Sequence, residues 1–139
     1  MKIMFEKFFP DEYLGSTYKI PFEKLYEQGY RGVIFDIDNT LVPHGAPADE
    51  RAKRLFQRLR EIGFESCLLS NNQKKRVEMF NQEIQTHYIY NALKPARKNY
   101  LHAMEIMGTD QANTLFVGDQ LFTDVWGCLL YTSDAADDK

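Results

Sequence analysis

Short apolar runs alternate along this chain with stretches whose apolar residues recur at helical spacing. Each run is bounded by polar residues and is short enough for a buried strand. Four such runs are present: Gly32–Phe35, Cys67–Leu69, His87–Tyr90 and Leu115–Val117. We expect helices over residues 22–28, 49–63, 73–83 and 96–107. Strands alternating with helices indicate βαβ units, so we predict an α/β fold with three Rossmann-like layers and a mainly parallel sheet.

Composition agrees with one globular domain and excludes several other classes. Of the 139 residues, 44% are hydrophobic and 27% are charged, which is typical of a folded chain. The 17 basic and 20 acidic residues give a net charge of -3, which argues against a nucleic-acid binder that depends on neutralising phosphates. Its two cysteines provide neither a disulfide framework nor zinc-site spacing.

Membrane attachment and secretion are not indicated by the hydropathy pattern. No apolar run approaches the ~20 residues that a membrane span needs, and Glu6 and Lys7 interrupt the apolar N-terminus, unlike a secretory signal. We therefore expect a cytoplasmic protein. The N-terminal aromatic residues leave a contact with a membrane surface open, although packing against the domain is the favoured interpretation. These residues are Phe5, Phe8, Phe9 and Tyr13.

Polar residues follow three of the predicted strands directly. Asp36 and Asp38 come after the first strand, Ser70 after the second and Asp119 after the fourth. Ligands of open α/β sheets bind at the carboxyl ends of the strands. We therefore expect these side chains to meet at one site.

The residue types at this site suit phosphoryl chemistry. One carboxylate of the Asp36/Asp38 pair can act as nucleophile and the other as acid and base. Two carboxylates so close repel each other unless a cation lies between them, and Mg2+ prefers oxygen ligands. Asp119 and Asp124 could complete such a shell.

Groups able to bind the phosphate follow the second strand and precede the last helix. Ser70 and the neighbouring backbone N–H groups could hold a phosphoryl oxygen. Lys94 could act in catalysis by placing a positive charge beside the nucleophile and the developing phosphoryl charge. Lys74, Lys75 and Arg76 also follow Ser70 closely, but we interpret them as a solvated helix face.

Together these residues resemble the four ordered motifs of the haloacid dehalogenase superfamily. The motifs are Asp36-Ile-Asp-Asn-Thr, Ser70, Lys94-Pro95 and Gly118-Asp119 with Asp124, and the match spans residues 33 to 127. The resemblance implies that Asp36 forms an aspartyl-phosphate, while Asp38 protonates the leaving alcohol and then activates water. It also implies that Asp36, the Asp38 carbonyl and Asp119 bind Mg2+, with Asp124 supporting the site. Ser70, Asn71 and Lys94 would bind the substrate phosphate.

The spacing of the motifs leaves no room for a cap domain. The intervals from Asp38 to Ser70 and from Ser70 to Lys94 hold only a loop, two helices and one strand. This resembles the capless subfamily IIIA. The run from Ile20-Pro21 to Gly29-Tyr30-Arg31-Gly32 narrows the resemblance to the YqeG family, which is related to the phosphatidylglycerophosphate phosphatases of organelles.

The resemblance implies a Mg2+-dependent phosphatase whose substrate is a phosphorylated small molecule or lipid. A phosphotransferase with an acceptor other than water remains an alternative within enzymes. A non-catalytic binding module that keeps the fold is another alternative, although such a module has no need of both Asp36 and Asp38.

The last twelve residues, 128–139, differ from the rest of the chain in composition. They are small and acidic, and they resemble what one frame of a common sequencing adapter encodes. We therefore interpret residues 1–127 as a hydrolase domain that is incomplete at its C-terminus, and residues 128–139 as a non-native tail. A truncation there would leave Leu115–Val117 as an unpaired sheet edge.

Overall fold

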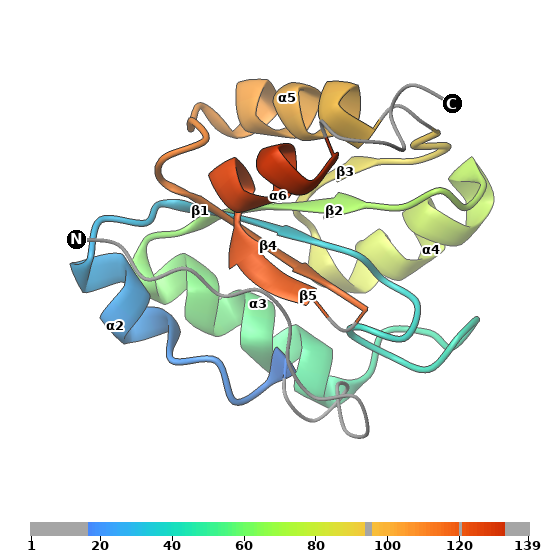
Figure 1. Cartoon of the computed structure of the whole chain (residues 1–139). Coiled ribbons are helices and arrows are strands. Elements are labelled where there is room, and N and C mark those ends of the chain that lie inside the picture. The colour runs from blue at the N-terminus through green and yellow to red at the C-terminus, as the bar shows by residue number, and fades with distance from the viewer. Residues whose placement is uncertain (1–16, 94–95, 120, 133–139) are drawn as a thin grey trace.

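The sheet is the centre of the molecule (Figure 1). The computed structural model describes residues 17–93, 96–119 and 121–132. Its five strands have the order β3-β2-β1-β4-β5, in which β1 to β4 are parallel and β5 is antiparallel to β4. Their bounds are β1 Gly32–Phe35, β2 Glu65–Leu69, β3 His87–Ile89, β4 Thr114–Gly118 and β5 Leu121–Asp124. The α/β fold with a mainly parallel sheet is confirmed.

Helices cover both faces of this sheet, which gives three layers (Figure 1). They are α2 Phe22–Glu27, α3 Glu50–Ile62, α4 Lys74–Ile84, α5 Ala96–Met107 and α6 Val125–Thr132. Side chains alternate along β1, so Val33 and Phe35 join the core under α2, α3 and α4, whereas Ile34 joins the core under α5 and α6. Within the described residues, no helix combines the length and the apolar character needed to cross a bilayer.

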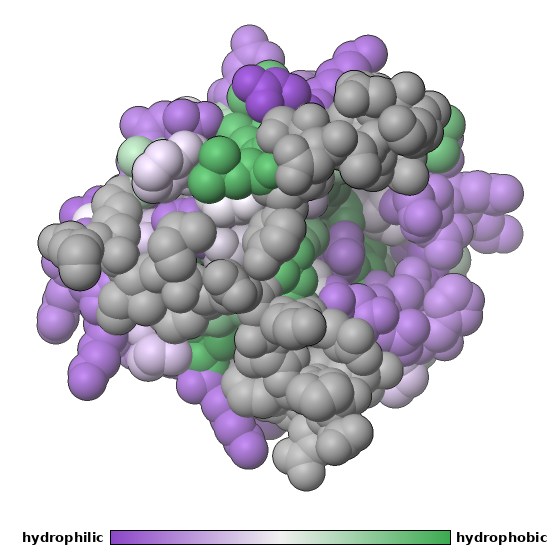
Figure 2. All heavy atoms as spheres, in the orientation of Figure 1, coloured by the Kyte–Doolittle hydropathy of each residue, from purple (hydrophilic) through white to green (hydrophobic). Residues whose placement is uncertain are grey.

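Helix α3 shows how local sequence sets an element's limits. The side chain of Asp49 accepts a hydrogen bond from Ala52 N at 2.8 Å and so caps the first turn. The helix ends at Gly63, whose φ of 120° suits a residue without a Cβ atom. Its buried residues form the predicted stripe: Ala52, Leu55, Phe56 and Leu59. Hydrophilic residues occupy much of the rim of the molecule in Figure 2, as expected when such stripes face inward.

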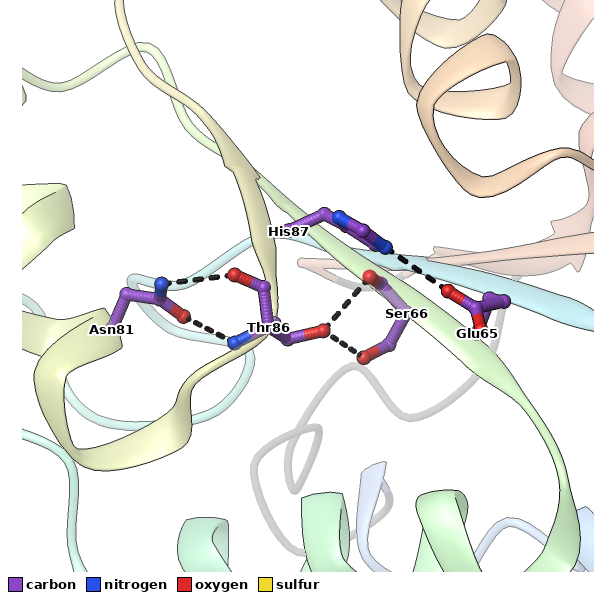
Figure 3. A network of polar contacts seen from close by, with 5 residues as sticks. All are labelled: Glu65, Ser66, Asn81, Thr86 and His87. Atoms are coloured by element: carbon purple, nitrogen blue, oxygen red, sulfur yellow. Dashed lines mark hydrogen bonds and ion pairs between the residues drawn. The ribbon is translucent and has the colours of Figure 1, made fainter.

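A polar network fixes the edge strand β3 against β2 (Figure 3). The Asn81 amide pairs with the backbone of Thr86 through bonds of 2.9 and 3.0 Å. The Thr86 hydroxyl in turn contacts Ser66, with 2.6 Å to its hydroxyl and 2.9 Å to its carbonyl oxygen. These contacts hold the amino end of β3 against the amino end of β2.

The prediction of an unpaired edge at β4 is wrong. Residues 121–124 form β5, and the register pairs Gly118 with Leu121 and Leu115 with Asp124. Two residues separate the paired ends, which is the commonest hairpin length. Phe122 and Thr123 also have high strand propensity and are buried, so pairing with β4 removes them from water.

Helix α6 continues the chain across residue 127. Cys128 and Leu129 are buried in the core beneath α5. The non-native origin of residues 128–139 stays a prediction, and residues 133–139 lie outside the described part. The aromatic residues of the first 16 positions also lie outside it.

Candidate active site

A cavity of about 340 Å3 opens at the carboxyl ends of β1, β2 and β4. Five residues of the predicted site line it: Asp36, Asp38, Ser70, Asn71 and Asp119. They are separated by up to 83 positions along the chain (119 minus 36) and meet because parallel strands end at the same edge of the sheet. Tyr100 from α5 and Phe116 from β4 form an apolar part of the wall, with ring centroids 5.3 Å apart.

Main-chain contacts fix Asp36 at the base of the cavity. The residue follows β1 directly, and its N–H donates to the Val117 carbonyl oxygen at 3.0 Å, which ties it to β4. Gly118 allows the close approach of the two strands' ends. A Cβ atom at position 118 would lie 3.1 Å from Asp36 Oδ2 and 2.5 Å from the Phe116 ring.

The carboxyl group of Asp36 is in an environment that disfavours its charge. Burial raises its pKa to about 7, and the carboxylates of Asp119 and Asp38 add to the shift, while a hydrogen bond from the Asp119 backbone opposes it. Asp36 thus lies close enough to Asp119 and Asp38 for their negative charges to disfavour its own. A cation placed between them would relieve this repulsion.

The donor set fits a hard cation that keeps several water ligands. Asp36 and Asp119 offer carboxylate oxygens, and Mg2+ is usually bound by one or two carboxylates together with substrate phosphate. In the described part of the chain no group of three or more His, Cys, Asp or Glu side chains could hold a metal. An all-side-chain cage is therefore not formed there, and a two-carboxylate site remains.

Asp38 is held by two donors that both contact Oδ1. Gly45 N lies at 2.8 Å and an Arg76 guanidinium nitrogen (NH2) at 2.7 Å. Burial alone would raise the pKa of Asp38, but Gly45 and Arg76 outweigh it and hold the pKa below its ordinary value. The interpretation of Arg76 as part of a solvated face is wrong, since only 16% of its side chain is exposed. Lys74 and Lys75 are exposed, as expected.

Ser70 is fixed at the end of β2. Its N–H donates to the Ile89 carbonyl oxygen at 3.0 Å, and its own carbonyl accepts from Ala92 N at 2.9 Å. The hydroxyl oxygen accepts from Asn72 N at 3.0 Å. Because the oxygen accepts that bond, the hydroxyl proton can be donated to a ligand in the cavity. Asn71 is exposed at the mouth.

The remaining two residues of the predicted site are Lys94 and Asp124, and Asp124 does not line the cavity. Lys94 lies outside the described residues. Asp124 is only 1% exposed, and its Oδ1 accepts from Gly127 N at 2.8 Å, which caps the first turn of α6. The Tyr30 hydroxyl donates to Asp124 Oδ2 at 3.4 Å. Asp124 is therefore a buried helix cap and not part of the cavity wall.

Comparison with known structures agrees with the fold class. A crystal structure of a hypothetical protein from Xanthomonas campestris aligns with a TM-score of 0.53 at 18% sequence identity. The alignment covers 70% of this chain and 59% of that one, so this chain spans less than two thirds of that protein's length. The molecule is thus an α/β protein of the Rossmann-like class, with acidic residues gathered at its strand ends.

Comparison of sequences defines the family. No protein-family model matches the chain. The probable phosphatase YqeG of Bacillus subtilis is 38% identical over 126 residues, which cover 89% of this chain and 73% of that protein. The chain belongs to the YqeG family.

Proposed function

We propose that this protein is a phosphatase that hydrolyses a phosphate monoester through an aspartyl-phosphate on Asp36. The observation that carries the proposal is the meeting of Asp36, Asp38, Ser70 and Asp119 in one cavity. The name of the Bacillus subtilis relative, a probable phosphatase, supports the same reaction. The order of the motifs, which resembles the haloacid dehalogenase superfamily, supports the covalent route.

The proposed reaction has two steps, formation of the aspartyl-phosphate and its hydrolysis. A carboxylate oxygen of Asp36 bonds to phosphorus while the bond from phosphorus to the leaving oxygen breaks, and Asp38 gives that oxygen a proton. Water then gives a proton to Asp38 and bonds to the same phosphorus, which breaks the bond to Asp36 and releases inorganic phosphate. Both steps need Asp38 beside the cavity, where the structure has it.

Phosphate binding is assigned to Ser70, Asn71 and Lys94. The Ser70 hydroxyl can donate to a phosphoryl oxygen, and the Asn71 amide lies at the mouth of the same cavity. Lys94 is proposed from its motif alone.

Mg2+ is the cofactor that we propose for this site. The carboxylates of Asp36 and Asp119 and the main-chain carbonyl of Asp38 would hold it, with Asp124 supporting them from behind. Once bound, it would neutralise charge on the carboxylates and on the phosphoryl oxygens. The buried carboxyl group of Asp36 and the neighbouring negative charge of Asp119 support this assignment.

An open site supports a broad range of substrates. Between Asp38 and Ser70 the chain forms only a loop, α3 and β2, and between Ser70 and Leu93 only α4 and β3 with their connections. We infer a cytoplasmic enzyme whose substrate is a phosphorylated metabolite or a lipid phosphate such as phosphatidylglycerophosphate.

The test is release of phosphate by the full chain from p-nitrophenyl phosphate, phosphorylated metabolites and phosphatidylglycerophosphate, with Mg2+ or with EDTA. We expect Mg2+-dependent turnover that falls to background in Asp36→Asn. Asp110→Asn is the matched control. Asp110 is exposed, precedes the amino end of β4 rather than the carboxyl end where the cavity lies, and accepts bonds from backbone N–H groups that asparagine can also satisfy. Turnover by Asp36→Asn at the wild-type rate would overturn the covalent route, and an inactive wild type would overturn the function.

A further inference from the structure

The ion pair between Arg76 and Asp38 connects two elements that are distant in sequence. Arg76 lies in the first turn of α4, whereas Asp38 lies in the loop after β1, 38 residues earlier. The guanidinium approaches Oδ1 to 2.7 Å, and the two side chains are only 16% and 17% exposed. A pair so shielded from water is weakened less by solvent and salt than a surface pair.

The position of Arg76 leaves one of its hydrogen-bond donors buried and unpaired within the described part of the chain. Its Nε is buried and has no hydrogen-bond partner among the described residues, which costs free energy. The guanidinium lies 5.6 Å from the centroid of the Phe80 ring and lines a groove of about 500 Å3 together with Gly45. Arg76 and Asp38 therefore stand between this groove and the cavity of the candidate site.

The contacts to Asp38 are distributed unequally over its two oxygens. Gly45 N and Arg76 both contact Oδ1, and no described residue donates a hydrogen bond to Oδ2. A carboxylate held through one oxygen from two directions cannot rotate freely, so its second oxygen keeps one orientation. That oxygen is the one left for proton transfer.

We propose that Arg76 is a positioning residue that orients the Asp38 carboxylate for proton transfer to the leaving group. This inference rests on the proposed function. During the first step the proton leaves a carboxyl oxygen of Asp38 and bonds to the oxygen that departs from phosphorus. A transfer of this kind depends steeply on the placement of the donor, since a misplacement of about 1 Å can cost a factor of roughly 100 in rate.

The dependence on the leaving group separates positioning from a purely structural role. Phenyl phosphate and p-nitrophenyl phosphate have nearly the same shape, but phenol is the poorer leaving group and needs its proton more. We expect Arg76→Gln to lower kcat on phenyl phosphate by about tenfold or more, with a clearly smaller loss on p-nitrophenyl phosphate and little change in KM. Arg76→Lys should restore part of the rate, since it keeps the charge but not the planar geometry.

A double-mutant cycle tests whether Arg76 acts through Asp38. In the Asp38→Asn background, Arg76→Gln should cause no further loss of kcat on phenyl phosphate. Lys75→Gln is the matched control: it removes a neighbouring, exposed charge and should keep the wild-type ratio of the two rates. Thermal unfolding of each variant establishes that it is folded. Should Arg76→Gln be unfolded, Arg76→Lys provides the test, with the same selective loss on phenyl phosphate expected.

Three outcomes decide the matter. Equal losses on both esters, or losses in the double variant that multiply, would overturn the positioning role while leaving the phosphatase intact. A wild type that hydrolyses neither ester, nor any substrate of the wider panel, would overturn the proposed function itself. Selective loss that vanishes in the Asp38→Asn background is the result that we expect.

Discussion

Asp124 has two candidate roles, as a metal ligand and as a structural helix cap, and these can be separated by experiment. Its carboxylate is buried, caps α6 through Gly127 N at 2.8 Å and accepts from the Tyr30 hydroxyl at 3.4 Å. Two substitutions separate these roles. Asp124→Asn keeps an oxygen that can accept from Gly127 N, whereas Asp124→Ala removes both acceptors.

The expected cost follows from these contacts. Loss of a helix cap costs about 1 kcal/mol, with a range of roughly 0.5–2 kcal/mol. A buried hydrogen bond adds about 1 kcal/mol, but the long 3.4 Å contact to Tyr30 should give less than this. We therefore expect Asp124→Ala to lower the free energy of unfolding by about 1–3 kcal/mol. Asp124→Asn should lie within about 1 kcal/mol of wild type, because it keeps the cap and buries no charge.

Urea unfolding followed by circular dichroism measures both values, and phosphate release is measured on the same samples. With Asp124 as a cap, stability falls in the alanine variant and is largely kept in the asparagine variant, which also keeps most of its Mg2+-dependent activity. The reasoning is refuted if Asp124→Asn is as stable as wild type but needs far more Mg2+ for activity. That pattern would make Asp124 a direct metal ligand.

Two further predictions come from buried contacts. Gly118→Ala should lower the free energy of unfolding by about 1–3 kcal/mol and reduce activity, because the new methyl group would meet the Phe116 ring at 2.5 Å and Asp36 Oδ2 at 3.1 Å. Gly108→Ala is the control: nothing lies within 4 Å of the new methyl group, so the φ of 74° should reduce stability while activity is kept. Burial, together with the nearby Asp124 carboxylate, raises the pKa of Tyr30 from its ordinary value of 10.0 to about 12. The contribution of the neutral Tyr30 hydroxyl to stability is therefore complete below pH 10.0 and is lost as the pH rises through about 12. Tyr30→Phe should flatten this part of the pH–stability curve, and an unchanged slope would show that other groups cause it.

Much of the fold could be predicted because its signals are local. The β1 strand has the bounds that its apolar run predicts, and α3 begins and ends where Asp49 and Gly63 indicate. The meeting of Asp36 with Ser70 and Asp119 needed only one general rule, that parallel strands end at the same edge of the sheet. Neither inference required knowledge of contacts between distant residues.

The missed features depend on such contacts or on competing local signals. Arg76 reads as one of three cations on a helix, and only the folding of the β1 loop against α4 brings it to Asp38. The sequence motif that contains Asp124 draws attention away from a strand over Leu121–Asp124, which Phe122 and Thr123 favour. The cap at Asp124 had a detectable signal, since an aspartate directly before an apolar helical stretch is typical of a helix start.

The central place of β1 has a consequence for how such an enzyme can diversify. Parallel neighbours hold β1 on both sides, and the Asp36 N–H continues this ladder to Val117. The Asp36 carboxylate is thus located largely by peptide groups, which every sequence shares. Asn71, in the loop after β2, lines the cavity, and Gly45, in the loop after β1, contacts Asp38; neither residue belongs to this ladder. Natural variation or laboratory selection could therefore exchange the preferred alcohol by altering these loops while the same aspartate stays in its place.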